Sequence, residues 1–368
     1  MTNPKPETRN PKPKDRTVLV AMSGGVDSSV AAGVLLEQGY RVCGVTMLLW
    51  PEDVPGAEEG CCGTVHLNDA REVCHQLGIP HYTLDLQKEF LANVVHPFVA
   101  TYLDGRTPNP CISCNEHLKF SHLLRKATGI GADLLATGHY ARILGNGQLQ
   151  LARGVDLSKD QTYFLFTLNQ EEMSRLLFPL GEMSKEEVRL KARSLALSVH
   201  EKPESQEICF VPPGKLRDFI SENAPDLPGP GEVVDLKGNV IGRHDGACFF
   251  TVGQRKGLGI ASPEPLYVVR IDAVTNTVVM GTREAASFEG LLASGVSWVD
   301  DKPPGSRFKA QVQIRHRHTP ASSVIKVQSD GGISVDFMEP QHGVAPGQAV
   351  VVYDGDIVLG GGWISKAR

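Results

Sequence analysis

The first half of the chain alternates short apolar runs with amphipathic stretches. The apolar runs predict buried strands of a parallel sheet, and they span residues 17–22, 40–50, 79–86 and 134–137. The amphipathic stretches predict helices, and they span residues 28–38, 68–77 and 170–196. Strands that alternate with helices are typical of an α/β fold built on a parallel sheet.

The pattern changes after residue 210. Proline punctuates residues 211–231, and short β-type runs follow, separated by Gly and Asp-Gly turns. These runs cover residues 232–235, 247–252, 266–271, 277–280, 309–315, 323–328, 333–337, 349–353 and 357–364. We therefore expect four parts, which are a disordered tail at 1–16, an α/β domain at 17–210, a small central β-rich domain at 211–286 and a C-terminal β-barrel-like domain at 287–368.

Composition narrows the setting in which the chain works. No apolar run reaches the ~20 residues of a membrane span, and the proline-rich N-terminus lacks the apolar centre of a secretory signal. We therefore expect a cytoplasmic protein with no membrane partner. The net charge is −5, so any surface that binds nucleic acid must be a local basic patch. In a reducing compartment, the eight cysteines indicate catalysis, metal binding or burial rather than disulfides.

A glycine-rich loop, residues 23–28, joins the first predicted strand to the first predicted helix. Gly24 and Gly25 allow the backbone to approach a ligand closely. The helix that follows directs unpaired N–H groups and its positive dipole end at the loop, which predicts an anion site. Asp27 would repel a bare phosphate, but a carboxylate there suits a bound Mg²⁺.

The loop lacks the lysine of the G-x-x-x-x-G-K-[ST] pattern. It resembles instead the S-G-G-x-D-S loop of the PP-loop ATP pyrophosphatases, which bind pyrophosphate there and split ATP between the α- and β-phosphates. The resemblance implies an adenine nucleotide alpha hydrolase-like fold for residues 17–210. The ATP contacts it implies are Ala21, Met22, Ser23, Gly24, Gly25, Val26, Asp27 and Ser28. The loop alone does not choose among amidation, argininosuccinate synthesis and thiolation.

Cys111 and Cys114 form a Cys-x-x-Cys pair, and Cys209 is a candidate third thiolate. Such a pair in an α/β enzyme serves redox exchange, metal ligation or nucleophilic sulfur chemistry. A zinc site needs four ligands, and the sequence has no second Cys-x-x-Cys. Three thiolates with an open position suit a [4Fe–4S] cluster. Three other cysteines stand in apolar or small-residue contexts that favour inert burial, namely Cys43, Cys74 and Cys248.

A series of further motifs makes the chain similar to the tRNA-specific 2-thiouridylases over nearly all of its length after residue 16. The motifs occur at residues 23–28, 60–62, 105–110, 114–115, 119–120, 136–142, 159–165, 208–210 and 251–255. The resemblance implies that ATP adenylates O2 of the wobble uridine, position 34 of a tRNA, and that sulfur then displaces AMP to give 2-thiouridine. It also implies tRNAs of the Lys, Glu and Gln type as partners, and a cysteine desulfurase or sulfur-relay protein as the source of sulfur.

The resemblance assigns roles to individual residues. Cys209 matches the cysteine that carries the transferable persulfide, and Cys114 matches the partner that assists release by forming a disulfide with it. Met47 and Gly138 match nucleotide contacts. The implied contacts to the target base and the tRNA are Asn109, Pro110, Cys111, His139, Lys159, Asp160, Gln161, Arg315, His316 and Gln348.

The chain departs from the family pattern at two places. Many relatives carry Asp where this chain has Cys111, and residues 204–207 replace the Asp-Ser-Thr-Gly that precedes the last cysteine in many relatives. A thiolate does not easily replace a carboxylate base, but it is an excellent iron ligand. A [4Fe–4S] cluster on Cys111, Cys114 and Cys209 therefore remains an alternative to the persulfide–disulfide route. The neighbouring pair at 61–62 belongs to a family segment, and we expect it to be structural.

Two short basic stretches are the best candidates for RNA-facing surfaces. One is residues 159–161, and the other is residues 315–318. If the second stretch is a strand, alternation puts Arg315 and Arg317 on one face and His316 and His318 on the other. Two guanidinium groups on one face suit phosphates.

Two other functions are compatible with parts of the sequence. A PP-loop ligase acting on a small molecule shares the loop at 23–28 but has no need of Cys114, Cys209 or a β-rich C-terminal half. A non-enzymatic RNA-binding or iron–sulfur carrier protein has no use for Asp27 in a phosphate loop.

Overall fold

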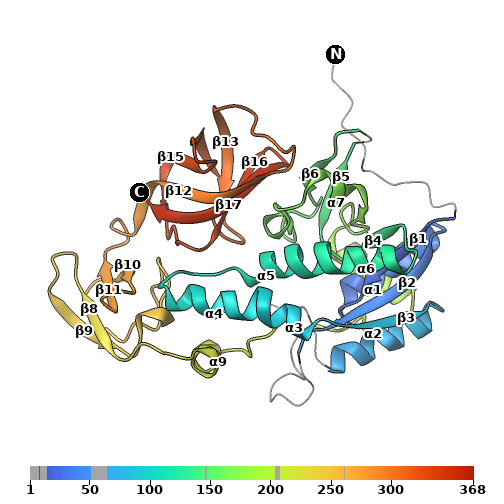
Figure 1. Cartoon of the computed structure of the whole chain (residues 1–368), viewed down its shortest axis with the longest axis horizontal. Coiled ribbons are helices and arrows are strands. Elements are labelled where there is room, and N and C mark those ends of the chain that lie inside the picture. The colour runs from blue at the N-terminus through green and yellow to red at the C-terminus, as the bar shows by residue number, and fades with distance from the viewer. Residues whose placement is uncertain (1–7, 9–14, 51–63, 146, 204–207, 261) are drawn as a thin grey trace.

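The computed structural model describes residues 8, 15–50, 64–145, 147–203, 208–260 and 262–368. Most of the predicted tail at 1–16, the cysteine pair at 61–62 and the departing segment at 204–207 lie outside this range. Three β-structures follow one another along the described chain and lie in separate regions of Figure 1. None of the helices in the described part is both long and apolar enough to cross a membrane.

The N-terminal sheet is parallel, with the strand order β3-β2-β1-β4-β7. Its strands are β1 (Thr17–Ala21), β2 (Arg41–Leu48), β3 (His81–Asp85), β4 (Leu134–Ala136) and β7 (Leu176–Leu177). The first four confirm the strands predicted from apolar runs. Alternate residues of β1 serve opposite faces, because Val18 and Val20 enter one core while Leu19 enters another. The sheet is thus buried on both sides, as parallel sheets are.

Helices cover both faces of this sheet (Figure 1). One core is closed by α1 (Val26–Glu37), α2 (Thr64–Gln76) and α8 (Lys185–Ser194). The other core is closed by a helical layer that the sequence analysis did not predict. It consists of α3 (Gln87–Phe90), η1 (Leu91–Val95), α4 (His96–Leu103), α5 (Pro110–Ser113), η2 (Cys114–Leu123) and α6 (Leu124–Gly129). In this layer η1 and η2 are π-helical.

The single helix predicted over 170–196 is wrong. The segment contains α7 (Gln170–Ser174), the short strand β7, a loop and then α8. Pro179 and Gly181 stand in the loop and interrupt the helical pattern. Both α7 and α8 begin with a capping box, in which Asn169 and Ser184 accept from the N3 backbone. The preceding connection contains η3 (Thr162–Phe164).

The central β-structure is a four-stranded sheet of order β10-β11-β8-β9, reached through α9 (Leu216–Asn223). Its strands are β8 (Gly231–Val234), β9 (Val240–His244), β10 (Tyr267–Asp272) and β11 (Thr277–Gly281). The strand predicted at 247–252 is wrong, because η4 (Ala247–Phe249) and a turn occupy it. Phe250 from this segment instead fills the core of the central sheet.

The C-terminal β-structure is a barrel of six strands. They are β12 (Ser287–Trp298), β13 (Arg307–Gln313), β14 (Ala321–Val327), β15 (Ile333–His342), β16 (Ala349–Asp354) and β17 (Ile357–Ala367). Pairing of β12 with both β15 and β17 closes the barrel. The sequence analysis missed β12 altogether. Two further strands, β5 (Ala141–Leu144) and β6 (Gln150–Arg153), come from the N-terminal half and extend the barrel sheet from β17.

Candidate nucleotide and thiol site

The glycine-rich loop lies at the carboxyl end of β1, where the strand order reverses between β2 and β4. This is the position at which open α/β sheets bind ligands. The Ser28 hydroxyl lies 3.1 Å from the Ser23 amide nitrogen, whose N–H it accepts, and 3.2 Å from the Ser23 hydroxyl. Gly24 has a φ of 65°, and a Cβ added there would lie 2.2 Å from the carbonyl oxygen of His66. The sharp turn therefore requires glycine.

Gly138, just after β4, packs directly against the start of α1. A Cβ on Gly138 would lie 2.7 Å from the Ser28 amide nitrogen and 2.8 Å from the Asp27 carbonyl carbon. Ala21, Val26 and Met47 lie around the same end of the sheet, and the Met47 side chain is buried in the core. The residues predicted to contact ATP are thus gathered at one edge of the sheet.

The Asp27 carboxylate has two partners inside this edge. Asp27 Oδ1 accepts from the Tyr140 hydroxyl at 2.8 Å and from Lys185 Nζ at 2.7 Å. Lys185 is the first residue of α8, and its ammonium group brings a positive charge beside the loop. An anion site with one carboxylate therefore also carries a cation that compensates it.

A second lysine contacts the loop from the segment that leads to Cys209. Lys202 Nζ donates to the Gly24 carbonyl oxygen at 3.0 Å and lies 2.9 Å from Nδ1 of His66. It also forms a salt bridge with Asp69 of α2. The glycine-rich loop is thereby joined to both α2 and the chain that precedes the third candidate cysteine.

The Cys-x-x-Cys pair lies at the start of one long helical segment made of α5, η2 and α6 (Figure 1). Its middle, η2, is π-helical from Cys114 to Leu123. Hydrogen bonds from i to i+5 bring residues five apart about one turn above one another, whereas in an α-helix they would be about 140° apart around the axis. Lys119 therefore lies over Cys114. Its Nζ donates to the buried Asn115 Oδ1 at 2.9 Å, and Asn115 Nδ2 donates to the Phe164 carbonyl oxygen at 3.0 Å.

The three candidate cysteines share one neighbourhood, and each thiol is half-buried. The pKa of Cys111 is raised to about 12, mainly by burial and also by the nearby Cys209, while Lys119 opposes the shift. Burial also raises the pKa of Cys114 to about 12, with Lys119 opposing and Cys209 and Cys111 adding to the shift. Cys111 and Cys114 are consequently protonated at neutral pH. Cys43, Cys74 and Cys248 are buried, as the sequence analysis expected.

His139 connects the nucleotide edge to the thiol helix, because it follows Gly138 directly. Its ring lies 6.1 Å from Phe120 of η2 and 6.0 Å from Phe178, measured between ring centroids. Nδ1 lies 2.7 Å from the Thr137 hydroxyl. Burial, with a smaller contribution from Lys119, lowers the pKa of His139 well below its usual range. The imidazole is therefore neutral and available for hydrogen bonding.

The loop at 105–109, between α4 and α5, contacts both the central part and the barrel. A Cβ on Gly105 would lie 2.8 Å from Ile271 of the central sheet. The Thr107 hydroxyl donates to that of Thr251 at 3.2 Å, and the Thr107 N–H donates to the Pro346 carbonyl oxygen of the barrel at 2.8 Å. The loop that carries Asn109 and Pro110 is therefore fixed against both C-terminal parts.

Gln348 stabilises this junction from the barrel side. Its Nε2 donates to the Pro108 carbonyl oxygen at 2.8 Å, and its Oε1 accepts from the Tyr163 hydroxyl at 3.3 Å. These contacts hold the 105–109 loop in place. Gln348 was expected to contact tRNA, and its amide is engaged within the protein here.

The first of the two expected RNA-facing clusters is largely internal. Asp160 is 8% exposed and forms a salt bridge with Arg153, whose guanidinium lies 3.8 Å from the centre of the Tyr353 ring. The Gln161 side chain accepts from the Tyr140 N–H at 3.0 Å. Lys159 is half-buried. The carboxylate of this cluster therefore bonds Arg153 of β6, which packs on the barrel, and the amide bonds the backbone at Tyr140.

The strand expected over 315–318 is wrong, because β13 ends at Gln313 and a turn follows. Arg317 has a φ of 60°, which breaks the alternation of side chains. Arg315 Nη1 donates to the His342 carbonyl oxygen at 3.0 Å, and the His316 ring stacks on Phe164 with centroids 4.7 Å apart. The Phe164 carbonyl oxygen also accepts from Asn115 of the thiol helix, so the exposed turn packs on a residue that is hydrogen-bonded to that helix.

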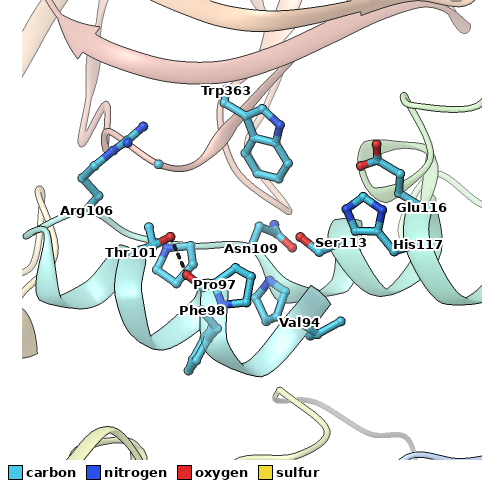
Figure 2. Close-up of a pocket in the computed structure, with 13 residues that line it drawn as sticks. Val94, Pro97, Phe98, Thr101, Arg106, Asn109, Ser113, Glu116, His117 and Trp363 are labelled. Carbon is cyan, nitrogen blue, oxygen red and sulfur yellow. Dashed lines mark hydrogen bonds between the residues drawn. The ribbon is translucent and has the colours of Figure 1, made fainter. Parts of the chain in front are cut away.

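A cavity of about 370 Å³ lies between α4, the start of the thiol helix and the barrel. Figure 2 shows the Trp363 side chain pointing from the barrel towards Asn109, with Arg106 on one side and Glu116 and His117 on the other. The cavity is also lined by Val94, Pro97, Phe98, Thr101, Pro108, Pro110, Ser113 and Gly347. Cys111, Cys114 and Cys209 are not among its lining residues.

The cysteines do not fit an iron–sulfur cluster as they lie. Among the described residues, no three His, Cys, Asp or Glu side chains form a group that could hold a metal ion. The thiols are close enough to raise one another's pKa but are not arranged as cluster ligands. Asp27 is a different case, because Mg²⁺ needs only one or two carboxylates when substrate phosphates supply the other ligands.

Comparison with known protein families finds three consecutive matched regions in the chain. Residues 16–213 match the family described as tRNA methyl transferase HUP domain, residues 217–282 match its PRC-barrel domain, and residues 288–364 match the aminomethyltransferase β-barrel domain. A protein from Syntrophotalea carbinolica, named tRNA-specific 2-thiouridylase MnmA, is 50% identical over 355 residues, covering 96% of this chain and 100% of the relative. The chain belongs to the tRNA-specific 2-thiouridylase family.

Other members of the thiouridylase family are equally similar. The protein of that name from Geotalea uraniireducens is 50% identical over 361 residues, covering 96% of each chain. The one from Chloroflexus aggregans is 48% identical over 352 residues, covering 95% of this chain and 98% of the relative. The N-terminal parallel-sheet domain, the small central domain and the C-terminal barrel are therefore those of a thiouridylase, as predicted.

Several residues of this thiouridylase site were not singled out from the sequence. Lys119 and Tyr140 stand inside motifs at 119–120 and 136–142, which was a signal that could have found them. Lys185 and Lys202 carry no local motif, and only the fold brings them to the loop. Trp363 likewise gains its position from the closure of the barrel.

Proposed function

We propose that the chain is an ATP-dependent tRNA-uridine 2-sulfurtransferase that acts on the wobble uridine. One observation carries the proposal. Gly138 touches the phosphate loop, and its neighbour His139 lies against Phe120 of the helix that carries Cys114. A nucleotide-activating loop and a thiol helix therefore adjoin through two consecutive residues. Family membership supports the same function.

The first step that we propose is activation of the base. O2 of the flipped uridine attacks the α-phosphorus of ATP, and the bond to the β-phosphate breaks, so that pyrophosphate leaves. The N3 proton of the uridine passes to solvent in this step, and N3 takes a proton back when 2-thiouridine forms. The loop N–H groups and the Lys185 ammonium, 2.7 Å from Asp27, would stabilise the negative charge on the leaving group. Mg²⁺ on Asp27, with the phosphates as its other ligands, would neutralise charge there.

The second step is sulfur transfer through a persulfide. The terminal sulfur of a persulfide on Cys209 attacks C2 of the adenylated uridine, and AMP leaves with the electron pair of the C–O bond. The Cys114 thiolate then attacks Sγ of Cys209, and the electron pair of the broken S–S bond passes to the sulfur on C2. The products are 2-thiouridine and a Cys114–Cys209 disulfide, which a thiol reductant must reduce before the next turnover.

Lys119 has a defined part in this proposal. Cys114 must lose its proton to attack, yet burial raises its pKa to about 12. The Lys119 ammonium, held over Cys114 by Asn115, is the nearby positive charge that favours the thiolate. In this proposal Lys119 acts on Cys114, by favouring its thiolate, and does not touch the uridine.

The partners follow from this chemistry. We propose that the RNA is a tRNA with uridine at position 34, of the Lys, Glu or Gln type, and that the central domain and the 315–318 turn contribute to its binding. A cysteine desulfurase or a sulfur-relay protein would load the persulfide on Cys209. We favour this route over a cluster because, among the described residues, no group of side chains is arranged to hold a metal ion.

The test is a reconstituted reaction with unmodified tRNA, ATP, Mg²⁺, a cysteine desulfurase with cysteine, and a thiol reductant. We expect 2-thiouridine at position 34 and one AMP per modified base, measured by mass spectrometry of digested tRNA. In Cys209→Ala, 2-thiouridine should fall by about 10³-fold or more, whereas tRNA-dependent pyrophosphate release should continue.

Buried Cys74→Ala serves as the matched control, because this cysteine lies in the core on the other face of the sheet, which the thiol helix does not enter. Thiolation by Cys209→Ala at the wild-type rate would refute the assigned role. Pyrophosphate release that depends on a small metabolite and ignores tRNA would replace the proposal with a small-molecule ligase.

A further inference from the structure

Lys202 stands between the phosphate loop and the cysteine that would carry the transferable sulfur, and the reaction described above gives it no part. The ammonium group of a lysine has three N–H donors and no acceptor. Three acceptors face it here, namely the Gly24 carbonyl oxygen at 3.0 Å, Nδ1 of His66 at 2.9 Å and the carboxylate of Asp69. Because His66 and Asp69 lie about one turn apart on α2, the ammonium joins one face of that helix to the loop.

The stretch of chain that ends at Lys202 is fixed against the core closed by α1, α2 and α8. Val199 is buried in that core, and the Ser198 N–H donates to Gln76 Oε1 of α2 at 3.1 Å. The Lys202 N–H donates to the Val199 carbonyl oxygen at 3.0 Å. Pro203 follows and disfavours the helical region for Lys202, which restricts the backbone at the point where the chain leaves this core.

Cys209 has a second fixed point directly after it. Phe210 packs on the core at the other face of the sheet. Its ring centroid lies within 5.2 to 6.5 Å of the centroids of four other rings, those of Phe98, Phe90, Phe219 and Trp50. The hold on Cys209 from its C-terminal side is therefore independent of the phosphate loop, whereas the hold from its N-terminal side begins at Lys202, on the loop itself.

A bound nucleotide changes the strength of that second hold. Triphosphate in the loop at 23–28 brings negative charge next to Gly24, and the Lys202 ammonium on the Gly24 carbonyl oxygen is attracted by it. Nucleotide therefore binds more tightly to the state with the ammonium at the loop than to a state in which this segment has opened, and it shifts the population towards the former.

We propose that Lys202 is a positioning residue for Cys209, which holds the segment leading to this cysteine when nucleotide fills the loop. The thiol is thereby held while the base is activated, and it is released for reloading when pyrophosphate and AMP have left. The coupling is reciprocal, so the held segment also favours nucleotide binding. The inference rests on the proposed function, because it takes an adenine nucleotide as the ligand of the loop and Cys209 as the sulfur carrier.

The experiment measures the reactivity of Cys209 without tRNA and without turnover. Alkylation of Cys209 by iodoacetamide in the full chain is followed by peptide mass spectrometry, with and without Mg²⁺ and α,β-methylene-ATP, which cannot be split between the α- and β-phosphates. Isothermal titration calorimetry first gives the affinity of each chain for the analogue, so that every chain is saturated. In the wild type the analogue should slow alkylation of Cys209 by about fivefold or more, which is the lower end of the coupling typical between two sites.

Two uncharged variants separate the charge of Lys202 from its hydrogen bonds. Lys202→Met removes both, whereas Lys202→Gln removes the charge and keeps an N–H group that can donate to Gly24. In both variants the analogue should change the alkylation rate by less than about twofold, because the phosphates then have no ammonium to attract. Lys202→Arg keeps the charge and should keep most of the response. Either uncharged variant suffices if the other does not fold.

Lys191→Met is the matched control. Lys191 forms a salt bridge with Glu37 at the end of α1 that is remote from the loop. Its side chain is 28% exposed, against 22% for Lys202, so the two lysines are similarly placed in all but their distance from the loop. Lys191→Met should respond to the analogue as the wild type does.

Several results would overturn the inference. The analogue could leave alkylation of Cys209 in the wild type unchanged or make it faster, or both uncharged variants could respond as the wild type does. A response lost equally in Lys191→Met would be a general effect of a lost salt bridge. If the uncharged variants bind no analogue at all, Lys202 is a ligand of the nucleotide and not a link to Cys209. A wild type that binds no adenine nucleotide contradicts the proposed function itself, whereas one that binds it with no change at Cys209 contradicts this inference alone.

Discussion

The phosphate loop and the Cys-x-x-Cys pair each lie at the start of a helical segment, but the two sites are assembled differently. The loop is local, because its donors and its turn come from the consecutive residues 23–28. The thiol site is assembled from distant segments, since Cys114 and Cys209 stand on different parts of the fold and Lys119 reaches them only through a π-helical turn. Gly138 and His139 join the two halves.

The two sites also differ in whether their reactive groups are charged in the resting chain. The loop presents backbone N–H groups and the Lys185 cation whether or not a substrate is bound. The thiols are protonated in the resting chain, because burial raises the pKa of Cys111 and Cys114 to about 12. A site that activates ATP can be open to water, whereas a nucleophilic thiol that must not oxidise gains from being held as the neutral form.

Substitution of Gly138 tests the contact that joins the halves and should have the largest effect. In Gly138→Ala, the new Cβ would lie 2.7 Å from the Ser28 amide nitrogen, so the loop must move. Displacement of a reacting group by about 1 Å can cost about 10²-fold in rate. We expect tRNA-dependent pyrophosphate release to fall by about 100-fold, measured with a coupled pyrophosphatase assay.

The matched control for this substitution is Gly129→Ala at the end of α6. Apart from its own helix and chain neighbours, no described heavy atom lies within 4 Å of a Cβ at Gly129, and the residue is helical. Alanine there should leave activity unchanged and stabilise the helix slightly. Wild-type pyrophosphate release in Gly138→Ala would show that the nucleotide does not depend on this contact.

Removal of the Lys119 charge tests the thiol half alone. Lys119→Met removes the positive charge that opposes the raised pKa of Cys114. A loss of about one pKa unit of stabilisation reduces the thiolate about tenfold at a fixed pH below the pKa. We expect alkylation of Cys114 by iodoacetamide at pH 8.5 to slow by about tenfold, with its pH profile displaced upwards, as followed by peptide mass spectrometry.

Lys119→Arg should keep most of the reactivity, because the positive charge remains. The exposed Lys126→Met, further along the same helical segment, controls for a general loss of charge. Identical alkylation rates in Lys119→Met and the wild type across the pH range would remove Lys119 from the mechanism.

The parts of the fold that were predicted are those in which one stretch of sequence determines its own structure. The runs of β1, β2 and β4 are apolar because both faces of each strand are covered, so their pattern is strong. The edge strand β3 is half-buried to exposed, and its pattern is weaker. The layer at 87–129 was missed because its residues pack on a core rather than follow one helical period, and two of its segments are π-helical. The strand β12 was missed for a related reason, since it pairs irregularly with two partners.

In the candidate site, too, the residues that could be predicted are those whose role depends only on neighbouring sequence. The loop at 23–28 could be predicted because its anion-binding groups are its own backbone. The contacts of Asp160 with Arg153 and of Gln348 with Pro108 could not be, because each joins residues that the sequence places far apart. A family motif identifies such residues as important without distinguishing a side chain that faces RNA from one that holds two domains together.

The smallest effect concerns the stability that the buried thiols give to the fold. Burial holds the pKa of Cys111 near 12, while a thiol in the unfolded chain ionises near its ordinary value of about 8.5. Between these values the unfolded chain loses a proton that the folded chain keeps, so the free energy of unfolding falls as pH rises. The contribution is complete below about pH 8 and is lost progressively above it, on the order of 1 kcal/mol by pH 9.5.

In Cys111→Ser this component is absent, so urea unfolding followed by tryptophan fluorescence at pH 7.5 and 9.5 should show a smaller pH-dependent loss of the free energy of unfolding than in the wild type. The serine variant has a different stability at every pH, and only the change with pH bears on the comparison. Parallel curves for the two proteins would mean that the thiol half is no more shielded from water than the loop, and the contrast between the two regions would be lost.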